Sequence, residues 1–226
     1  MQTISYTNML LVLLRPRREP LGLMKTNVLT TIIGAAMLWV AASAQAEVSP
    51  QLIKDLNEAL QGESNASNRY ALFAQKAEKD GYPDVAKLFR ATSASEAIHR
   101  DEHKQAILKL GGQVVEFQLE AVTPGTTAEN LEAAIKGETY ENTEMYPKFM
   151  ALAEKEDARP AMRTLRFAME TEEAHAQLYR AALDNLGKQG PVDYYVCQVC
   201  GMTVTELPAE KCKVCRKPVD EYKKIS

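Results

Sequence analysis

Apolar side chains recur at every third or fourth position through most of the chain from residue 49 to residue 187. This spacing places them on one face of an α-helix. Ser49 provides an N-cap and Pro50 a favourable first helical residue, so the first helix begins there. Gly81-Tyr82-Pro83 interrupts the period and ends that helix. The central part of the chain is therefore predicted to be helical.

The pattern predicts four helices, separated by two short connections and one long connection. The long connection begins at Gln113, lacks a helical period and contains a turn at Pro124-Gly125. Thr126 stands three positions before Glu129, which is the spacing of a capping box at the start of the third helix. The predicted helices cover approximately residues 49–80, 84–110, 126–154 and 160–186. Short, long and short connections are typical of a ferritin-like four-helix bundle with one crossover.

The composition changes after Gly190-Pro191. Four cysteines follow, in two C-x-x-C pairs separated by 11 residues: Cys197, Cys200, Cys212 and Cys215. This spacing predicts a tetrahedral four-thiolate metal site, and a segment this small needs such a staple because it cannot build a sufficient core. Iron and zinc both suit four thiolates, and disulfide pairing is a further alternative.

A basic start at Met24-Lys25, an apolar run from Val28 to Ala42 and an Ala-x-Ala ending have the form of a secretory signal peptide. We predict cleavage after Ala46 and an exported, periplasmic mature protein. The run is shorter than the roughly 20 residues that a membrane span needs, so no span is expected after cleavage. An uncleaved anchor is the alternative.

Residues 1–23 fit the signal less well. They either precede a true start at Met24 or form a long basic region, in which Arg17-Arg18 resembles a twin-arginine export signal. The predicted organisation has three parts, an export segment, a helical metal-binding domain and a four-cysteine domain, at residues 1–46, 47–188 and 192–226.

The overall composition is that of a globular protein. Hydrophobic residues make up 46% of the 226 residues and charged residues 25%, with a formal net charge of −3. The first 46 residues carry four Arg or Lys and one Glu, so the remaining chain carries a formal charge of −6. An acidic chain without a basic run argues against nucleic acid as a partner.

Two Glu-x-x-His pairs stand on predicted helices, Glu96 with His99 and Glu172 with His175. A spacing of three places both side chains on the same helix face, so each pair can offer a carboxylate and an imidazole to one point. The other two helices supply the further glutamates Glu63, Glu138 and Glu141. Carboxylates with imidazoles from four helices are the ligand set of a di-iron bundle, whereas a single pair would more often be a solvated face.

Four further residues lie near these pairs on the predicted helices: Glu141, His103, Tyr70 and Tyr146. Glu141 offers a seventh ligand that would let the site rearrange with oxidation state. His103 follows His99 by one helical turn, and we expect a surface histidine near the bundle end, with a role around the metals as the alternative. Tyr70 and Tyr146 each follow a glutamate by two turns, where they either hydrogen-bond ligating carboxylates or simply fill the core.

Together these motifs resemble the rubrerythrin family. The resemblance covers residues 49–226, and the matching stretches are GESNASNRY, SEAIH, KGETYENTEMYP, EEAHAQLYR, YVCQVCG and KCKVC. It implies a ferritin-like di-iron domain followed by a rubredoxin-like domain. Implied as di-iron ligands and catalytic residues are Glu63, Glu96, His99, Glu138, Glu141, Glu172 and His175. Implied as ligands of a rubredoxin-type iron are Cys197, Cys200, Cys212 and Cys215.

The resemblance further implies a peroxidase that reduces hydrogen peroxide to water, with electrons passing from the rubredoxin-type iron to the di-iron centre and no cofactor beyond the metals. The electron donor is unidentified. The resemblance also implies a homodimer in which the tail of one subunit approaches the bundle of the other. A ferroxidase, or a metal-binding protein with structural zinc in its tail, remains an alternative function.

The sequence departs from the family in two respects. A glycine usually follows each C-x-x-C pair of a rubredoxin-like site, but here Gly201 follows the first pair and Arg216 the second. The export signal is the second departure, because many rubrerythrins resemble cytoplasmic proteins.

Overall fold

The computed structural model describes residues 47–188 and 190–226. The predicted export segment at residues 1–46, including Arg17-Arg18 and Met24, lies outside the described residues. Cleavage after Ala46 therefore stays a prediction. Among the helices of the described part, none combines the length and the apolar character that a membrane span requires.

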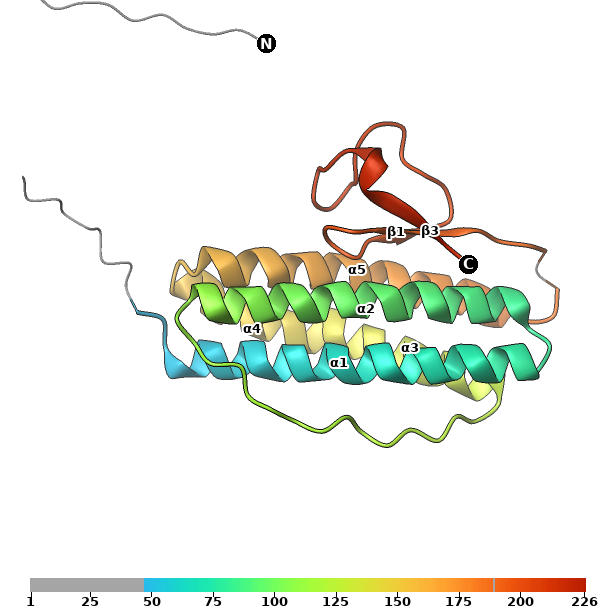
Figure 1. Cartoon of the computed structure of the whole chain (residues 1–226), viewed down its shortest axis with the longest axis horizontal. Helices are drawn as coiled ribbons and strands as arrows, with labels where there is room; N and C mark the ends of the chain where they lie inside the picture. Colours follow the sequence, from blue (N-terminus) through green and yellow to red (C-terminus); the bar gives the residue numbers. More distant parts are fainter. Residues whose placement is uncertain (1–46, 189) are drawn as a thin grey trace, which may run out of the picture. The chain divides into compact units, whose positions relative to one another are not determined.

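The described helices form a four-helix bundle whose third helix is interrupted (Figure 1). Helix α1 packs on α2, while α3 and α4 pack on α5. The elements are α1 (Pro50–Lys79), α2 (Pro83–Lys109), α3 (Thr127–Tyr140), η1 (Glu141–Met145), α4 (Tyr146–Lys155) and α5 (Arg159–Asp184). The arrangement confirms the predicted ferritin-like bundle.

The predicted helix starts are confirmed by their caps. The Ser49 hydroxyl accepts a hydrogen bond from the backbone N–H of Leu52 at 3.2 Å. At the start of α3, the Thr126 side chain accepts from the N–H of Glu129, and the Glu129 carboxylate accepts from the N–H of Thr126. Both arrangements satisfy amides that a helix start otherwise leaves unpaired.

The long connection between α2 and α3 runs along the bundle (Figure 1). Two asparagines of α1 bind its backbone: the Oδ1 atom of Asn57 accepts from the N–H of Val115 at 2.8 Å, and that of Asn65 accepts from Glu120 at 3.1 Å. These side-chain hydrogen bonds satisfy backbone N–H groups that have no helix or sheet partner in an irregular segment.

The third predicted helix is confirmed over residues 127–155, but it contains a π-helical turn that the spacing did not predict. A π-helical turn, η1, separates α3 from α4, and the N–H of Tyr146 bonds to the carbonyl of Glu141, five residues back. Pro147 has no N–H for the carbonyl of Thr143, and in a regular helix its ring would clash with that carbonyl. The wider turn accommodates the proline, and such turns are frequent at functional sites.

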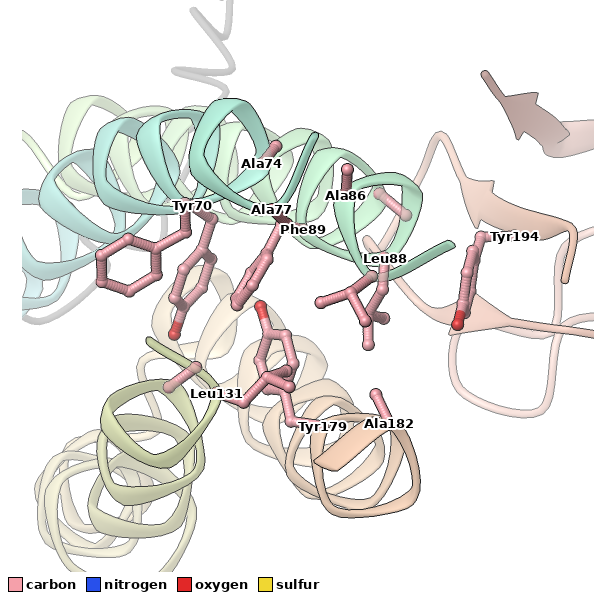
Figure 2. Close-up of a cluster of buried hydrophobic side chains, with 14 of the residues drawn as sticks. Tyr70, Ala74, Ala77, Ala86, Leu88, Phe89, Leu131, Tyr179, Ala182 and Tyr194 are labelled. Carbon is pink, nitrogen blue, oxygen red and sulfur yellow. The ribbon is translucent and has the colours of Figure 1, made fainter. Parts of the chain in front are cut away.

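Two hydrophobic clusters fill the bundle. One, shown in Figure 2, gathers aromatic rings of α1, α2 and α5, including Tyr70, Phe89 and Tyr179. The other includes Leu56 of α1 and Phe149 of α4. Each cluster excludes water from its part of the bundle, and the buried glutamates described below contact residues of both.

The C-terminal module is a small antiparallel sheet with the order β2-β1-β3. Its elements are β1 (Tyr194–Cys197), β2 (Thr203–Val204), the 3₁₀ turn η2 (Val219–Glu221) and β3 (Tyr222–Ile225). Phe167 and Ala174 of α5 share a hydrophobic cluster with Met202 and Val214 of the module. The mainly α fold with a small four-cysteine module agrees with the prediction.

Candidate functional site

All seven glutamates and histidines expected to bind metal are buried. They come from five elements: Glu63 from α1, Glu96 and His99 from α2, Glu138 from α3, Glu141 from η1, and Glu172 and His175 from α5. Each Glu-x-x-His pair lies on one helix face, as its spacing predicts. The bundle thus collects side chains from distant parts of the sequence at one place.

Six of these residues form two groups whose candidate ligand atoms all lie within 4.8 Å of one another. Glu96 and Glu172 belong to both groups. The first group adds Glu63 and His99, and the second adds Glu138 and His175. Two shared carboxylates between two ligand sets are the arrangement that a pair of bridged metal ions requires.

The two groups are nearly symmetric in their geometry. The Nδ1 atom of His99 lies 2.9 Å from Oε2 of Glu96 and 3.1 Å from Oε1 of Glu172. The Nδ1 atom of His175 lies 3.0 Å from the other oxygen of each of these carboxylates. Each imidazole therefore faces one oxygen of both shared glutamates.

The outer nitrogens of the imidazoles determine what the inner nitrogens can do. Nε2 of His99 lies 3.1 Å from the carbonyl oxygen of Cys200, which can only accept, so Nε2 carries the proton. Nε2 of His175 lies 3.1 Å from the Thr203 hydroxyl, which donates its own proton to the carbonyl of Gly201. With Nε2 protonated, the neutral rings present Nδ1 lone pairs inward, as metal-binding histidines do.

The residues fit a pair of cations. Eight buried side-chain atoms lack a hydrogen-bond partner among the described residues, and all belong to these two groups: Glu63 Oε2, both Oε atoms of Glu96, His99 Nδ1, Glu138 Oε2, both Oε atoms of Glu172, and His175 Nδ1. Through these atoms, four carboxylates and two imidazoles face one another without any other polar partner among the described residues. Buried polar atoms are rarely left unpaired, and divalent cations would satisfy them.

The pKa values show the same surplus of negative charge. Burial raises the pKa values of Glu138 and Glu141 well above their usual range, and neighbouring carboxylates add to the rise. Burial opposes the charged form of His99 and His175, but the carboxylates around them outweigh it and raise both pKa values well above the usual range. Protons thus hold the place that bound cations would take.

Two tyrosines donate hydrogen bonds to these carboxylates, which is the first of the two roles that their spacing left open. The Tyr70 hydroxyl donates to Oε1 of Glu138 at 2.6 Å, and the Tyr146 hydroxyl donates to Oε1 of Glu63. Both tyrosines are fully buried. Such bonds restrict the orientation of a carboxylate and tune its basicity.

The expectation for His103 was wrong. This residue is not at the surface: its side chain is fully buried, and its Nε2 atom lies 3.1 Å from the Tyr146 hydroxyl. The other nitrogen, Nδ1, lies 3.0 Å from the Thr164 hydroxyl of α5. His103 follows His99 by one turn and so lies on the same inward face of α2. A histidine can be buried there because Tyr146 and Thr164 supply hydrogen-bond partners for both ring nitrogens.

Glu141 differs from the other six residues. Its side chain is 9% exposed and belongs to neither of the two groups. It occupies the first position of the π-helical turn, one turn beyond Glu138. Its predicted role as a seventh ligand stays a prediction.

The four cysteines form a second site. All are free thiols whose sulfur atoms lie within 4.8 Å of one another, with Sγ–Sγ distances of 3.6 Å for Cys197–Cys215 and Cys200–Cys212. These distances are too long for disulfide bonds. They approach the roughly 3.8 Å edge of a tetrahedron with metal–sulfur bonds of about 2.3 Å, so the residues fit one tetrahedral ion.

The residues after the two C-x-x-C pairs adopt the same backbone conformation. Gly201 has φ +78° and donates its N–H to the carbonyl of Cys197; Arg216 has φ +63° and donates to the carbonyl of Cys212. The arginine therefore preserves the turn that glycine normally makes, at the cost of a left-handed backbone with a side chain.

The module contacts the bundle directly over the metal-binding helices. Besides the bonds from His99 and His175, the Ser95 hydroxyl donates to the carbonyl of Gly201 at 2.7 Å. A Cβ atom on Gly201 would overlap Nε2 of His99 and lie 2.6 Å from Oγ of Ser95. Ser95 and Thr203 were not predicted to have a role, because helical and sheet patterns do not indicate which surfaces dock. Both sides of this contact belong to one chain, and the predicted homodimer stays a prediction.

Comparison with known proteins shows which family has this architecture. The Rubrerythrin family matches residues 54–183, which is more than half of the chain. The chain belongs to the rubrerythrin family. Rubrerythrin-2 of Clostridium acetobutylicum is 33% identical over 171 residues, covering 74% of this chain and 92% of that protein.

Solved structures agree with this assignment. The fully reduced, all-ferrous state of nigerythrin matches with a TM-score of 0.69 and 27% identity, covering 89% of this chain and 100% of that chain. Mycobacterium tuberculosis bacterioferritin matches with a TM-score of 0.57 and 25% identity, covering 64% of this chain and 91% of that chain. Membership in the rubrerythrin family supports a di-iron oxidative-stress protein of the oxidoreductase class, with a second metal site at the four cysteines.

Proposed function

We propose that this rubrerythrin is a peroxidase. It reduces hydrogen peroxide to two water molecules, consuming two electrons and two protons, and the electrons enter through an iron held by the four cysteines. The observation that carries this proposal is the hydrogen bond between Nε2 of His99 and the carbonyl oxygen of Cys200. It links a candidate ligand of one metal site to a candidate ligand of the other, a link for which a ferroxidase has no need.

The chain supplies a binding site of defined charge and orientation. When bound, two ferrous ions would supply the electrons that cleave the O–O bond, and the four-thiolate iron would restore them one at a time. Glu96 and Glu172 would hold both ions, while the Nδ1 atoms of His99 and His175 would each bind one.

The surrounding residues keep the site rigid and dry. Tyr70 and Tyr146 hold Glu138 and Glu63 by hydrogen bonds. The tyrosines also belong to the two hydrophobic clusters, Tyr70 to one and Tyr146 to the other. In such a low-dielectric setting, the interaction between carboxylates and cations is stronger than in water.

The test is the metal content of the purified mature protein, followed by stopped-flow oxidation of the fully reduced form. We expect one thiolate-bound iron and two further irons per chain, with a thiolate-to-ferric absorption band that bleaches on reduction and returns rapidly with peroxide. Glu96→Ala and Glu172→Ala are the controls, because both should slow the return of the band while leaving the cysteine site intact.

Three results would contradict the proposal. Zinc at the four cysteines would remove the route for electrons and favour a structural tail. Return of the band at an unchanged rate in the two glutamate variants would show that peroxide reacts at the tail iron directly. Faster turnover with excess ferrous iron and oxygen than with peroxide would favour a ferroxidase.

We also propose that this activity operates outside the cytoplasm, in the periplasm. The support is the basic, apolar and Ala-x-Ala pattern of residues 24–46. N-terminal sequencing of protein recovered from a periplasmic fraction should begin at Glu47. Recovery of full-length chain from the cytoplasm would contradict the proposal.

A further inference from the structure

The two tyrosines that hold the carboxylates have different neighbours. Around Tyr70 the neighbours are aromatic rings, with centroids 5.5 Å away for Tyr179 and 6.0 Å for Phe89. Beside Tyr146 lies the imidazole of His103, stacked at 5.9 Å with an interplanar angle of 29°. The two halves of an otherwise symmetric site therefore differ.

The difference arises at equivalent positions of the two Glu-x-x-His helices. His103 follows His99 by four residues on α2, and Tyr179 follows His175 by four residues on α5. The hydroxyl of Tyr179 pairs with Thr92, whereas His103 reaches the hydroxyl of Tyr146. Only the half that contains Glu63 receives an imidazole at this position.

The number of available protons determines the direction of each hydrogen bond. The Tyr146 hydroxyl has one proton, which it donates to Glu63, so its oxygen must accept the bond from Nε2–H of His103. A neutral imidazole with Nε2–H leaves Nδ1 to accept from the Thr164 hydroxyl at 3.0 Å. Every donor then points towards Glu63, from Thr164 through His103 and Tyr146.

We propose that His103 is a positioning residue that acts through Tyr146 on Glu63 and makes the two metal positions inequivalent. The inference rests on the metal site of the proposed function. Donation into the phenol oxygen polarises the hydroxyl and strengthens its bond to the carboxylate, because hydrogen bonds in a chain reinforce one another. The orientation of Glu63 is thereby restricted more than that of Glu138, and Glu63 is the weaker base of the two. The tyrosine that holds Glu138, Tyr70, has an aromatic ring beside it in place of an imidazole.

The first test is the tautomer of His103 in the wild-type protein. ¹⁵N NMR of the imidazoles in the apoprotein and in the zinc-loaded protein should show His103 protonated at Nε2 and unprotonated at Nδ1. A ring protonated at Nδ1 would reverse the direction of the chain and overturn the inference. This measurement needs no variant and no activity assay.

The second test compares stepwise zinc affinities by competition with a chromophoric chelator. His103→Leu should weaken one of the two bundle steps by about tenfold, the lower end of the effect of removing a residue behind a metal ligand. His103→Gln should restore most of the affinity, because its amide N–H can donate to Tyr146. Tyr179→Phe is the matched control in the other half of the site, and it should not weaken the zinc-binding step that His103→Leu weakens.

Equal weakening by His103→Leu and Tyr179→Phe, without rescue by glutamine, would show that only packing matters and would overturn the inference. If the leucine variant does not fold, the glutamine variant and the wild-type tautomer still decide the question. Failure of the wild-type bundle to bind two zinc ions would instead refute the metal site on which the proposed function depends.

Discussion

Nε2 of His99 donates a hydrogen bond to the carbonyl oxygen of Cys200 at 3.1 Å. One nitrogen of the imidazole thus faces the bundle glutamates while the other contacts the cysteine module. This contact requires the two modules to approach closely, and the next residue, Gly201, shows how closely.

Gly201→Ala should separate the two sites without emptying either. The added Cβ would overlap His99 and Ser95, and the left-handed backbone disfavours any side chain. The overlap should disfavour the docked module by about 1.4 kcal/mol, which is about tenfold less docked form. The backbone strain falls on the module whether or not it is docked. Stopped-flow reoxidation of the thiolate iron should slow accordingly. Gly62→Ala is the control, because Gly62 has open space around it; an unchanged rate for Gly201→Ala would contradict the prediction.

The shared and unshared glutamates should differ in metal stoichiometry. Glu96→Gln and Glu172→Gln should each abolish binding of both bundle metals, because each residue belongs to both groups. Glu63→Gln and Glu138→Gln should each remove one. Zinc titration of the apoprotein monitored by calorimetry measures this directly. Equal losses for all four variants would contradict the shared arrangement.

Glu141→Ala should keep both bundle metals, because Glu141 belongs to neither group. If Glu141 is a ligand in only one oxidation state, the variant should turn over peroxide more slowly with unchanged zinc stoichiometry. Full turnover with both metals bound would exclude a role as the seventh ligand.

The pH dependence of the metal-free protein should be opposite to that of the metal-bound protein. The pKa values of His99, His175, Glu138 and Glu141 are all raised on folding, so these groups stabilise the apoprotein at low pH and lose that contribution as pH rises through their folded-state values. Thermal stability of the apoprotein should therefore fall between about pH 5 and pH 8.

Zinc affinity should rise over the same range, because binding must release protons. Differential scanning calorimetry and zinc titration in buffers of different ionisation enthalpy measure the two effects. Glu63 and Glu172, whose pKa values are lowered, act in the opposite direction and limit the slope only below about pH 4.5. An apoprotein whose stability rises from pH 5 to pH 8 would contradict this account.

Arg216→Gly should stabilise the cysteine module. Arg216 has a positive φ angle that glycine adopts without steric cost, and the gain is partly offset by the greater freedom of glycine in the unfolded chain. We expect about 0.5–1 kcal/mol, measured as a higher denaturant midpoint for loss of the thiolate–metal band. Lys217→Gly is the neighbouring control and should not stabilise the module.

Local geometry made much of this protein predictable. Helical spacing alone places Glu96 with His99 and Glu172 with His175 on single faces, and capping chemistry predicts the starts of α1 and α3. The spacing of the cysteines likewise predicts one thiolate cluster, because each C-x-x-C pair forms a local turn. For the helix faces, the caps and each C-x-x-C turn, the residues that determine the feature lie within a few positions of one another.

The tertiary structure decided what depends on residues far apart in the chain. His103 is buried because Tyr146 and Thr164, from two other elements, supply its polar partners, and no spacing within α2 predicts them. The docking of Gly201 over His99 joins residues more than 100 positions apart. The sequence thus determined which side chains share a helix face or a turn, while packing between elements decided which of those faces meet, because burial of polar groups depends on partners that only the assembled fold provides.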